Sequence, residues 1–86
     1  MIGAIEMNLK ETIANRIEEL CRKNNLNASS LAYLCGMDPS TIYSILGSKS
    51  KSPEVVTIKK ICDGLDMTLG EFFSSSEFDQ LEQEIK

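Results

Sequence analysis

The stretch from residue 27 to residue 46 constrains the fold most, because it places two short apolar-patterned segments on either side of a three-residue connection. The first segment runs from about Ala28 to Cys35, the second from about Pro39 to Leu46, and the connection is Gly36-Met37-Asp38. A glycine in so short a turn supplies the positive φ that other residues adopt only with strain. The pattern predicts a helix-turn-helix unit, and the alternative is an αα-hairpin within an arbitrary bundle.

The side chains of this stretch have the sizes that such a unit needs. Ala32 lies where the two helices approach most closely, and a larger side chain there would push them apart. The apolar side chains predicted to lock the two helices together are Leu31, Cys35, Met37, Ile42 and Ile45. With Leu46 also facing the core, helical periodicity turns the other residues of the second helix outward: Pro39, Ser40, Thr41, Tyr43 and Ser44.

Three helix starts share one pattern, in which a polar cap stands between an apolar residue and another at the fourth helical position. The caps are Asn27, Asp38 and Thr68. Pro39 suits the first position of its helix, where a missing N–H costs nothing. Thr68 and Glu71 form a capping box, which starts a helix ending near Phe73.

Two further helices complete the predicted arrangement. One runs from about Leu9 to Lys23, with Asn24 and Asn25 as the turn that ends it. The polar stretch 47–53 is a loop, and it separates the helix-turn-helix from a helix over about Val55 to Gly64. That helix is expected to bury Val55, Ile58, Ile61, Cys62 and Leu65.

A chain of 86 residues makes one compact domain. We expect an N-terminal extension over residues 1–7, the helical domain over 8–73, and an acidic tail or short helix over 74–86. In the last segment, Phe78, Leu81 and Ile85 would share one side of a helix. No signal peptide and no apolar run long enough to span a bilayer is recognised, so a cytoplasmic protein without membrane contact is expected.

Charge is distributed unevenly along the chain, although the net value of −4 argues at first against binding nucleic acid. Residues 1–23 balance, residues 24–60 carry a net +2, and residues 61–86 carry −6. The acidity therefore belongs to the C-terminal quarter, and the middle of the chain can still face DNA.

Cysteine and histidine usage narrows the chemistry. The chain has three widely spaced cysteines, Cys21, Cys35 and Cys62, and no histidine. This excludes the usual zinc frameworks and favours free, packed thiols in a reducing compartment. Without a base partner for a cysteine and without a glycine-rich phosphate loop, we expect neither an enzyme nor a bound cofactor or metal.

The run from Leu26 to Phe73 resembles the lambda-repressor-like family of transcriptional regulators, also called the XRE family. The resemblance extends upstream through Ile13, Ile17 and Leu20 and so covers about residues 9–73. It implies an all-α, compact five-helix domain whose third helix enters the major groove, often with two protomers on a pseudo-palindromic site.

On this resemblance, the candidate base-contacting residues are Ser40, Thr41, Tyr43 and Ser44. The candidate phosphate-contacting residues are Asn27, Ser29, Ser48, Lys49, Ser50 and Lys51. Family members often carry glutamine, arginine or asparagine on the third helix and glutamine near the start of the second, where this chain has Ala28. Direct base readout is therefore expected to be modest, with DNA shape or bridging water contributing more.

The sequence thus predicts a sequence-specific binder of double-stranded DNA, a transcriptional repressor acting as a homodimer. The surface of the dimer is either the fifth helix, with Leu69, Phe72 and Phe73, or the tail. The alternative function is a protein-interaction module of the same fold, such as an antitoxin or an adaptor that binds another protein. The acidic C-terminal segment and the uncharged third helix favour this alternative.

Overall fold

The computed structural model describes residues 9–47 and 53–81, and within these ranges the regular structure is entirely helical. The helices are α1 (Leu9–Lys23), α2 (Ala28–Leu34), α3 (Pro39–Leu46), α4 (Val55–Gly64), α5 (Leu69–Phe72) and α6 (Ser76–Asp79). The predicted all-α fold is confirmed, and the first, third and fourth helices have the predicted bounds. The described residues contain six helices rather than five, because the segment predicted as a tail or short helix begins with the single turn α6.

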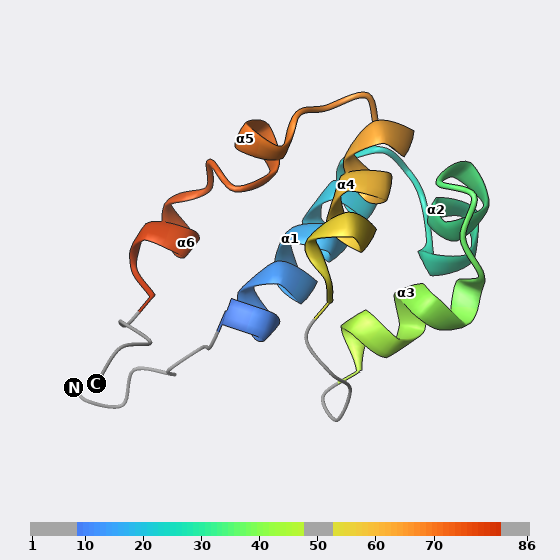
Figure 1. Cartoon of the computed structure of the whole chain (residues 1–86), viewed down its shortest axis with the longest axis horizontal. Helices are drawn as coiled ribbons and strands as arrows, with labels where there is room; N and C mark the ends of the chain where they lie inside the picture. The colour runs from blue at the N-terminus through green and yellow to red at the C-terminus, as the bar shows by residue number, and fades with distance from the viewer. Residues whose placement is uncertain (1–8, 48–52, 82–86) are drawn as a thin grey trace.

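Helix α1 lies at the centre of the arrangement (Figure 1). Helices α2 and α3 pack against each other on one side of it, and α1 also contacts α3 directly. Helix α4 contacts α2 and α5, and α6 returns to α1. The helix-turn-helix therefore lies at one end of the molecule, with α5 and α6 at the other (Figure 1).

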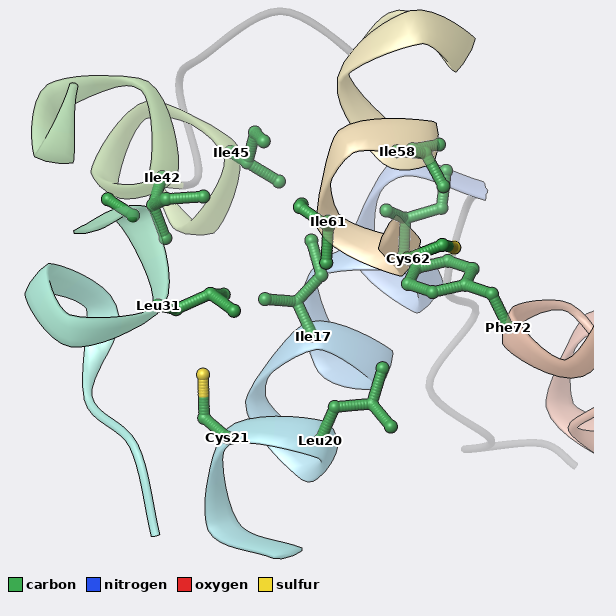
Figure 2. Packing of buried hydrophobic residues seen from close by; sticks show 12 residues of the cluster. Ile17, Leu20, Cys21, Leu31, Ile42, Ile45, Ile58, Ile61, Cys62 and Phe72 are labelled. Carbon is green, nitrogen blue, oxygen red and sulfur yellow. The ribbon is translucent and has the colours of Figure 1, made fainter. Parts of the chain in front are cut away.

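The core gathers one or more apolar side chains from each of the first five helices (Figure 2). Ile17, Leu31, Ile42, Ile61 and Phe72 are all 0% exposed. Their side chains converge between the helices, and Ile17 lies between the α2–α3 pair and α4 (Figure 2). Burying such side chains is the main favourable term in folding, at about 1.5–3 kcal/mol for each.

The predicted burial of Val55 is wrong, since this side chain is 66% exposed. The buried residues of α4 are Ile58, Ile61 and Cys62. Val55 is three residues before Ile58 and so points in a similar direction, but it is the first residue of the helix, roughly 4.5 Å further along the axis. The core does not extend that far, and Val56 beside it is 65% exposed as well.

Three helices end in the same way, with a Schellman motif. At the end of α2, the N–H of Met37 donates to the carbonyl of Ala32 at 2.8 Å, and Gly36 has φ of 69°. Asn25 after α1 and Asp66 after α4 occupy the same left-handed position, with φ of 56° and 58°. In each case the next residue is the apolar one that precedes a cap, so one helix ends where the next begins.

Arg16 of α1 is buried, which its position among the balanced charges of residues 1–23 does not indicate. Its Nε donates to the carbonyl of Phe72 at 2.8 Å and its Nη2 to the carbonyl of Glu71 at 2.9 Å. These carbonyls belong to the C-terminal end of α5, where the last carbonyls have no partner within the helix. The Glu71 carbonyl also accepts a hydrogen bond from the Ser74 hydroxyl at 2.8 Å. Nη1 donates to Glu19 at 2.7 Å. One guanidinium thus attaches α5 to α1.

Aromatic contacts hold the C-terminal helices together. The ring of Phe73 lies edge-on to both Phe72 and Phe78, with centroids 4.9 Å apart in each pair. Apolar packing therefore continues past Phe73 as far as α6. Of the tail or short helix expected over residues 74–86, the described residues contain one helical turn: α6 ends at Asp79, and Leu81 is not helical. Ile85 lies outside the described residues.

Candidate nucleic-acid interface

The start of α2 is set by Asn27, as the sequence predicts. Its side-chain oxygen accepts a hydrogen bond from the N–H of Ser30 at 2.8 Å, and the Ser30 hydroxyl accepts one from the N–H of Asn27 at 2.9 Å. This capping box occupies the side chain that was predicted to contact phosphate. Ser29, the next predicted phosphate contact, is exposed.

The start of α3 is set by Asp38 and Pro39. The Asp38 carboxylate accepts a hydrogen bond from the N–H of Ser40 at 2.9 Å, and this bond lowers the pKa of Asp38 below its ordinary value. Pro39 takes the first helical position. These two residues fix the angle at which α3 leaves the turn, and with it the direction of the exposed face of α3.

One face of α3 is in the core and the opposite face is open. Ile42 and Ile45 are buried and Leu46 is half-buried, as predicted. Of the four predicted base-contacting residues, Ser40, Tyr43 and Ser44 are exposed, while Thr41 is half-buried. The described part of α3 thus presents hydroxyl groups and one aromatic ring, without a charged side chain.

Tyr43 connects α3 with the beginning of α2. Its side chain is 56% exposed, and its hydroxyl lies 3.4 Å from the Ser29 hydroxyl. A predicted base contact and a predicted phosphate contact therefore lie side by side on one surface. The remaining predicted phosphate contacts lie outside the described residues: Ser48, Lys49, Ser50 and Lys51.

A lysine that sequence reasoning missed lies at the far end of α3. The Lys10 ammonium donates to the carbonyl of Gly47 at 2.6 Å and to that of Ile45 at 3.5 Å. Gly47 is the C-cap of α3. The lack of a basic residue in the last turn of α3 was a signal that a cation from elsewhere would be favourable there.

The cysteines are packing residues, as predicted. Cys21 and Cys62 are buried, Cys35 is half-buried, and all three are free. Burial raises the pKa of each of these thiols, which keeps them protonated near neutral pH. Within residues 9–47 and 53–81, no three potential ligands are grouped so that they could hold a metal ion. Nor is any helix in these ranges long and apolar enough to cross a membrane.

Comparisons with known proteins agree with this geometry. A family model described as a Cro/C1-type HTH DNA-binding domain matches residues 16–76, which include α2, the turn and α3. Among solved structures, the chain is similar to prophage Lp1 protein 11, with a TM-score of 0.77 and 26% identity over 90% of this chain and 100% of that one. No match is found among the curated proteins.

A second similar structure is an HTH_3 family transcriptional regulator from Vibrio cholerae. It has a TM-score of 0.67 and 29% identity over 76% of this chain, and the match covers 36% of that regulator. The likeness therefore concerns one domain of a longer protein. Because the family model spans well over half of this chain, the chain belongs to the Cro/C1-type helix-turn-helix family of DNA-binding domains, as its resemblance to the XRE family predicted.

Proposed function

We propose that this protein is a sequence-specific transcriptional repressor, which binds double-stranded DNA as a homodimer with α3 in the major groove. The observation that carries the proposal is the open, uncharged face of α3 next to the start of α2. An α-helix is about 10–12 Å across and the major groove is about 12 Å wide, so a helix exposed along one face can reach the base edges.

Base contacts come from the hydroxyl groups of Ser40 and Ser44, which are exposed, and of Thr41, which is half-buried. A hydroxyl forms single hydrogen bonds to either donors or acceptors, so it discriminates less than the bidentate contacts of arginine or glutamine. The Tyr43 ring packs on a thymine methyl group, or its hydroxyl bonds a phosphate beside Ser29. Sequence preference therefore depends partly on DNA shape.

Phosphate contacts come from two places. Ser29 offers an exposed hydroxyl at the start of α2, with the backbone around Asn27 next to it. The second place is the segment that follows Gly47, with Ser48, Lys49, Ser50 and Lys51. Lysine contacts to phosphate release counterions, so binding by this surface weakens as salt is added.

A homodimer compensates for the few base contacts that the exposed face of α3 can form, because binding to two half-sites doubles their number. The apolar side chains at α5, which are one of the two surfaces predicted for the dimer, mostly close the core. Phe72 is 0% exposed, and Leu69 and Phe73 are half-buried against the core. Exposed apolar side chains lie instead at the start of α4, where Val55 and Val56 are about two-thirds exposed.

Selection of bound sequences from a random duplex library tests this function. The expected result is a pseudo-palindrome with half-sites about 10 base pairs apart, or a multiple of that spacing. A variant with Tyr43→Ala and Ser44→Ala should lose the enrichment. Tyr33→Ala is the matched control, because Tyr33 is an 89% exposed tyrosine on α2. Failure to enrich any sequence would contradict the proposal, and enrichment of a single half-site would contradict the homodimer.

A protein partner is the second candidate, and the outer face of α2 favours it. Tyr33 is 89% exposed and Leu34 is 51% exposed, which leaves an aromatic and an aliphatic side chain adjacent in the chain without cover. Such side chains are enriched at protein interfaces. If the partner is the main ligand, Tyr33→Ala abolishes its capture and Ser44→Ala does not; the reverse result excludes this face.

A further inference from the structure

The first turn of α1 contacts the last turn of α3 through Lys10, a residue to which the proposed function gives no part. Lys10 and Gly47 are separated by 37 positions in the sequence, and the ammonium of Lys10 lies 2.6 Å from the Gly47 carbonyl oxygen. A second carbonyl, that of Ile45, lies 3.5 Å away. The side chain is half-buried, so the contact is not a freely solvated one.

Lys10 is unfavourably placed within its own helix but favourably placed for α3. The N-terminal end of a helix carries a partial positive charge, so a lysine at the second position of α1 gains nothing there. The C-terminal end of α3 carries a partial negative charge, and no basic residue of α3 lies in its last turn. The ammonium from α1 compensates that charge and donates to the carbonyls of Gly47 and Ile45.

The orientation of α3 therefore depends on both of its ends. Asp38 and Pro39 fix the start, and the N–H of Gly47 closes the last turn on the carbonyl of Tyr43 at 2.9 Å. Lys10 connects that last turn to α1, which packs against α3. Tyr43 and Ser44 lie in the turn that this contact holds.

We propose that Lys10 is a positioning residue for DNA binding, which holds the C-terminal end of α3 against α1 and so fixes the exposed face of α3. This rests on the proposed function, since it assigns Lys10 a part in presenting α3 to the groove. Lys10 acts through Tyr43 and Ser44 rather than on DNA itself.

The test compares three variants of the full chain. Lys10→Met keeps the aliphatic stem and removes the donors, Lys10→Arg keeps a cation, and Lys60→Met is the control, because it removes an exposed lysine from α4. On the duplex selected by the wild-type protein, Lys10→Met should weaken binding by roughly fivefold to tenfold. Lys10→Arg should recover part of that loss, and Lys60→Met should stay within about twofold. Equal affinities for Lys10→Met and Lys60→Met overturn the proposal.

Two readouts separate positioning from a direct phosphate contact. A lost phosphate contact lowers the slope of log affinity against log salt by about 0.9, whereas a displaced α3 leaves the slope unchanged. In a Tyr43→Ala, Ser44→Ala background, the effect of Lys10→Met should shrink, because the contacts that it positions are already gone. A lower slope, or the same fold-loss of affinity from Lys10→Met in both backgrounds, overturns the proposal that Lys10 is a positioning residue.

Hydrogen exchange keeps the test independent of DNA. The amide of Gly47 should exchange faster in free Lys10→Met than in free Lys60→Met, while the amide of Ile17 in the core stays unchanged. If no duplex is bound by the wild-type protein, the proposed function fails, and the Gly47 amide still reports whether Lys10 holds the end of α3. Equal exchange at Gly47 in the two variants contradicts that role.

Discussion

Buried polar contacts matter most at the scale of single residues. Arg16 is 9% exposed, and its guanidinium donates to two carbonyls of α5 and to the Glu19 carboxylate. A buried charge is stable only when such partners satisfy it. The single-turn helix α5 therefore depends on a side chain that lies more than fifty positions earlier in the chain.

Arg16→Ala should lower the free energy of unfolding by roughly 2–4 kcal/mol, because it removes the donor to the Phe72 carbonyl and one of the donors to the Glu71 carbonyl. Arg16→Lys should recover little, since an ammonium cannot reproduce the fork of the guanidinium. Urea denaturation measures both. Arg22→Ala, which removes an exposed arginine from the same helix, should change stability by less than about 0.5 kcal/mol. Equal stabilities for Arg16→Ala and Arg22→Ala would contradict this role.

Glu19 should contribute a pH-dependent part of the stability. The hydrogen bond from Arg16 lowers the pKa of Glu19 below its ordinary value of 4.5. A lowered pKa in the folded state gives stability that is present above the unfolded value and is lost as pH falls through the folded value. The wild-type protein should therefore melt at a higher temperature than Glu19→Gln near neutral pH, and the difference should close in acid. In an Arg16→Ala background the difference should be small at every pH.

Individual residues also show what the sequence could and could not predict. Asn27, Asp38 and Thr68 were predictable as caps because a cap depends only on neighbours within one turn. The contacts of Arg16 and Lys10 were not, because their partners are distant in sequence: the last turn of α3 lacks a basic residue, but nothing in the sequence shows which lysine or arginine compensates it. The exposure of Val55 depends on how far the core extends along α4. Helical periodicity predicts the direction of a side chain but not this extent.

At the scale of elements, α2 and α4 approach each other without room for another atom. A Cβ added at Gly64 would lie 2.5 Å from the Cys35 sulfur and 3.2 Å from the Cys35 Cα. Removal of the sulfur would relieve only the first contact, because the second is to the backbone. The spacing of these two helices is therefore set by a glycine that the sequence suggested only as the end of a helix.

Gly64→Ala should destabilise the fold by roughly 1–3 kcal/mol, since α2 or α4 must shift. Gly70→Ala is the matched control: a Cβ there would meet only the Thr68 hydroxyl at 3.8 Å. In the short helix α5, that change should be neutral or stabilise by up to about 1 kcal/mol. Thermal denaturation compares the melting temperatures of the two variants. A Gly64→Ala variant as stable as Gly70→Ala would show that the helices are not in this close contact.

The Schellman motif at the end of α4 predicts a stabilising change. Asp66 has a φ of 58°, which an L-residue adopts at some cost. Asp66→Gly should raise the free energy of unfolding by roughly 0.5–1 kcal/mol. Gly36→Ala, which places a side chain at a φ of 69°, should lower it by a similar amount. Chemical denaturation measures both changes. Changes of opposite sign in the free energy of unfolding are expected if both residues occupy the left-handed position of a Schellman motif, and a loss of stability in Asp66→Gly would contradict this.

At the scale of the whole molecule, a cluster of acidic side chains lies away from α3, whose nearest carboxylate is that of its N-cap, Asp38. An open hollow of about 340 Å³ between α1 and α6 is lined by Asn15, Glu18, Glu19, Arg22 and Glu77. This hollow holds carboxylates and would repel phosphate, whereas α3 carries no acidic residue. The net charge of −4 is therefore compatible with DNA binding by one end of the molecule.

The helix-turn-helix itself was predictable from residues 27–46, because glycine, cap and apolar spacing are all local there. Which side chains of α3 are open was largely predictable too, from helical periodicity, and Thr41 is the partial exception. The contact of Tyr43 with Ser29 and the attachment of α3 to α1 were not, because they depend on how the helices pack.

The central claim is that the exposed face of α3 binds DNA, and Ser40→Glu tests it most directly. A carboxylate near the N-terminus of α3 is favourable for the helix but repels DNA. The variant should therefore keep its stability and lose affinity for DNA. Ser76→Glu makes the same substitution at the start of α6, at the opposite end of the molecule from α3 (Figure 1). With the selected duplex, we expect Ser40→Glu to bind at least about tenfold more weakly than Ser76→Glu, with both variants folded. Equal affinities of the two folded variants would contradict the account.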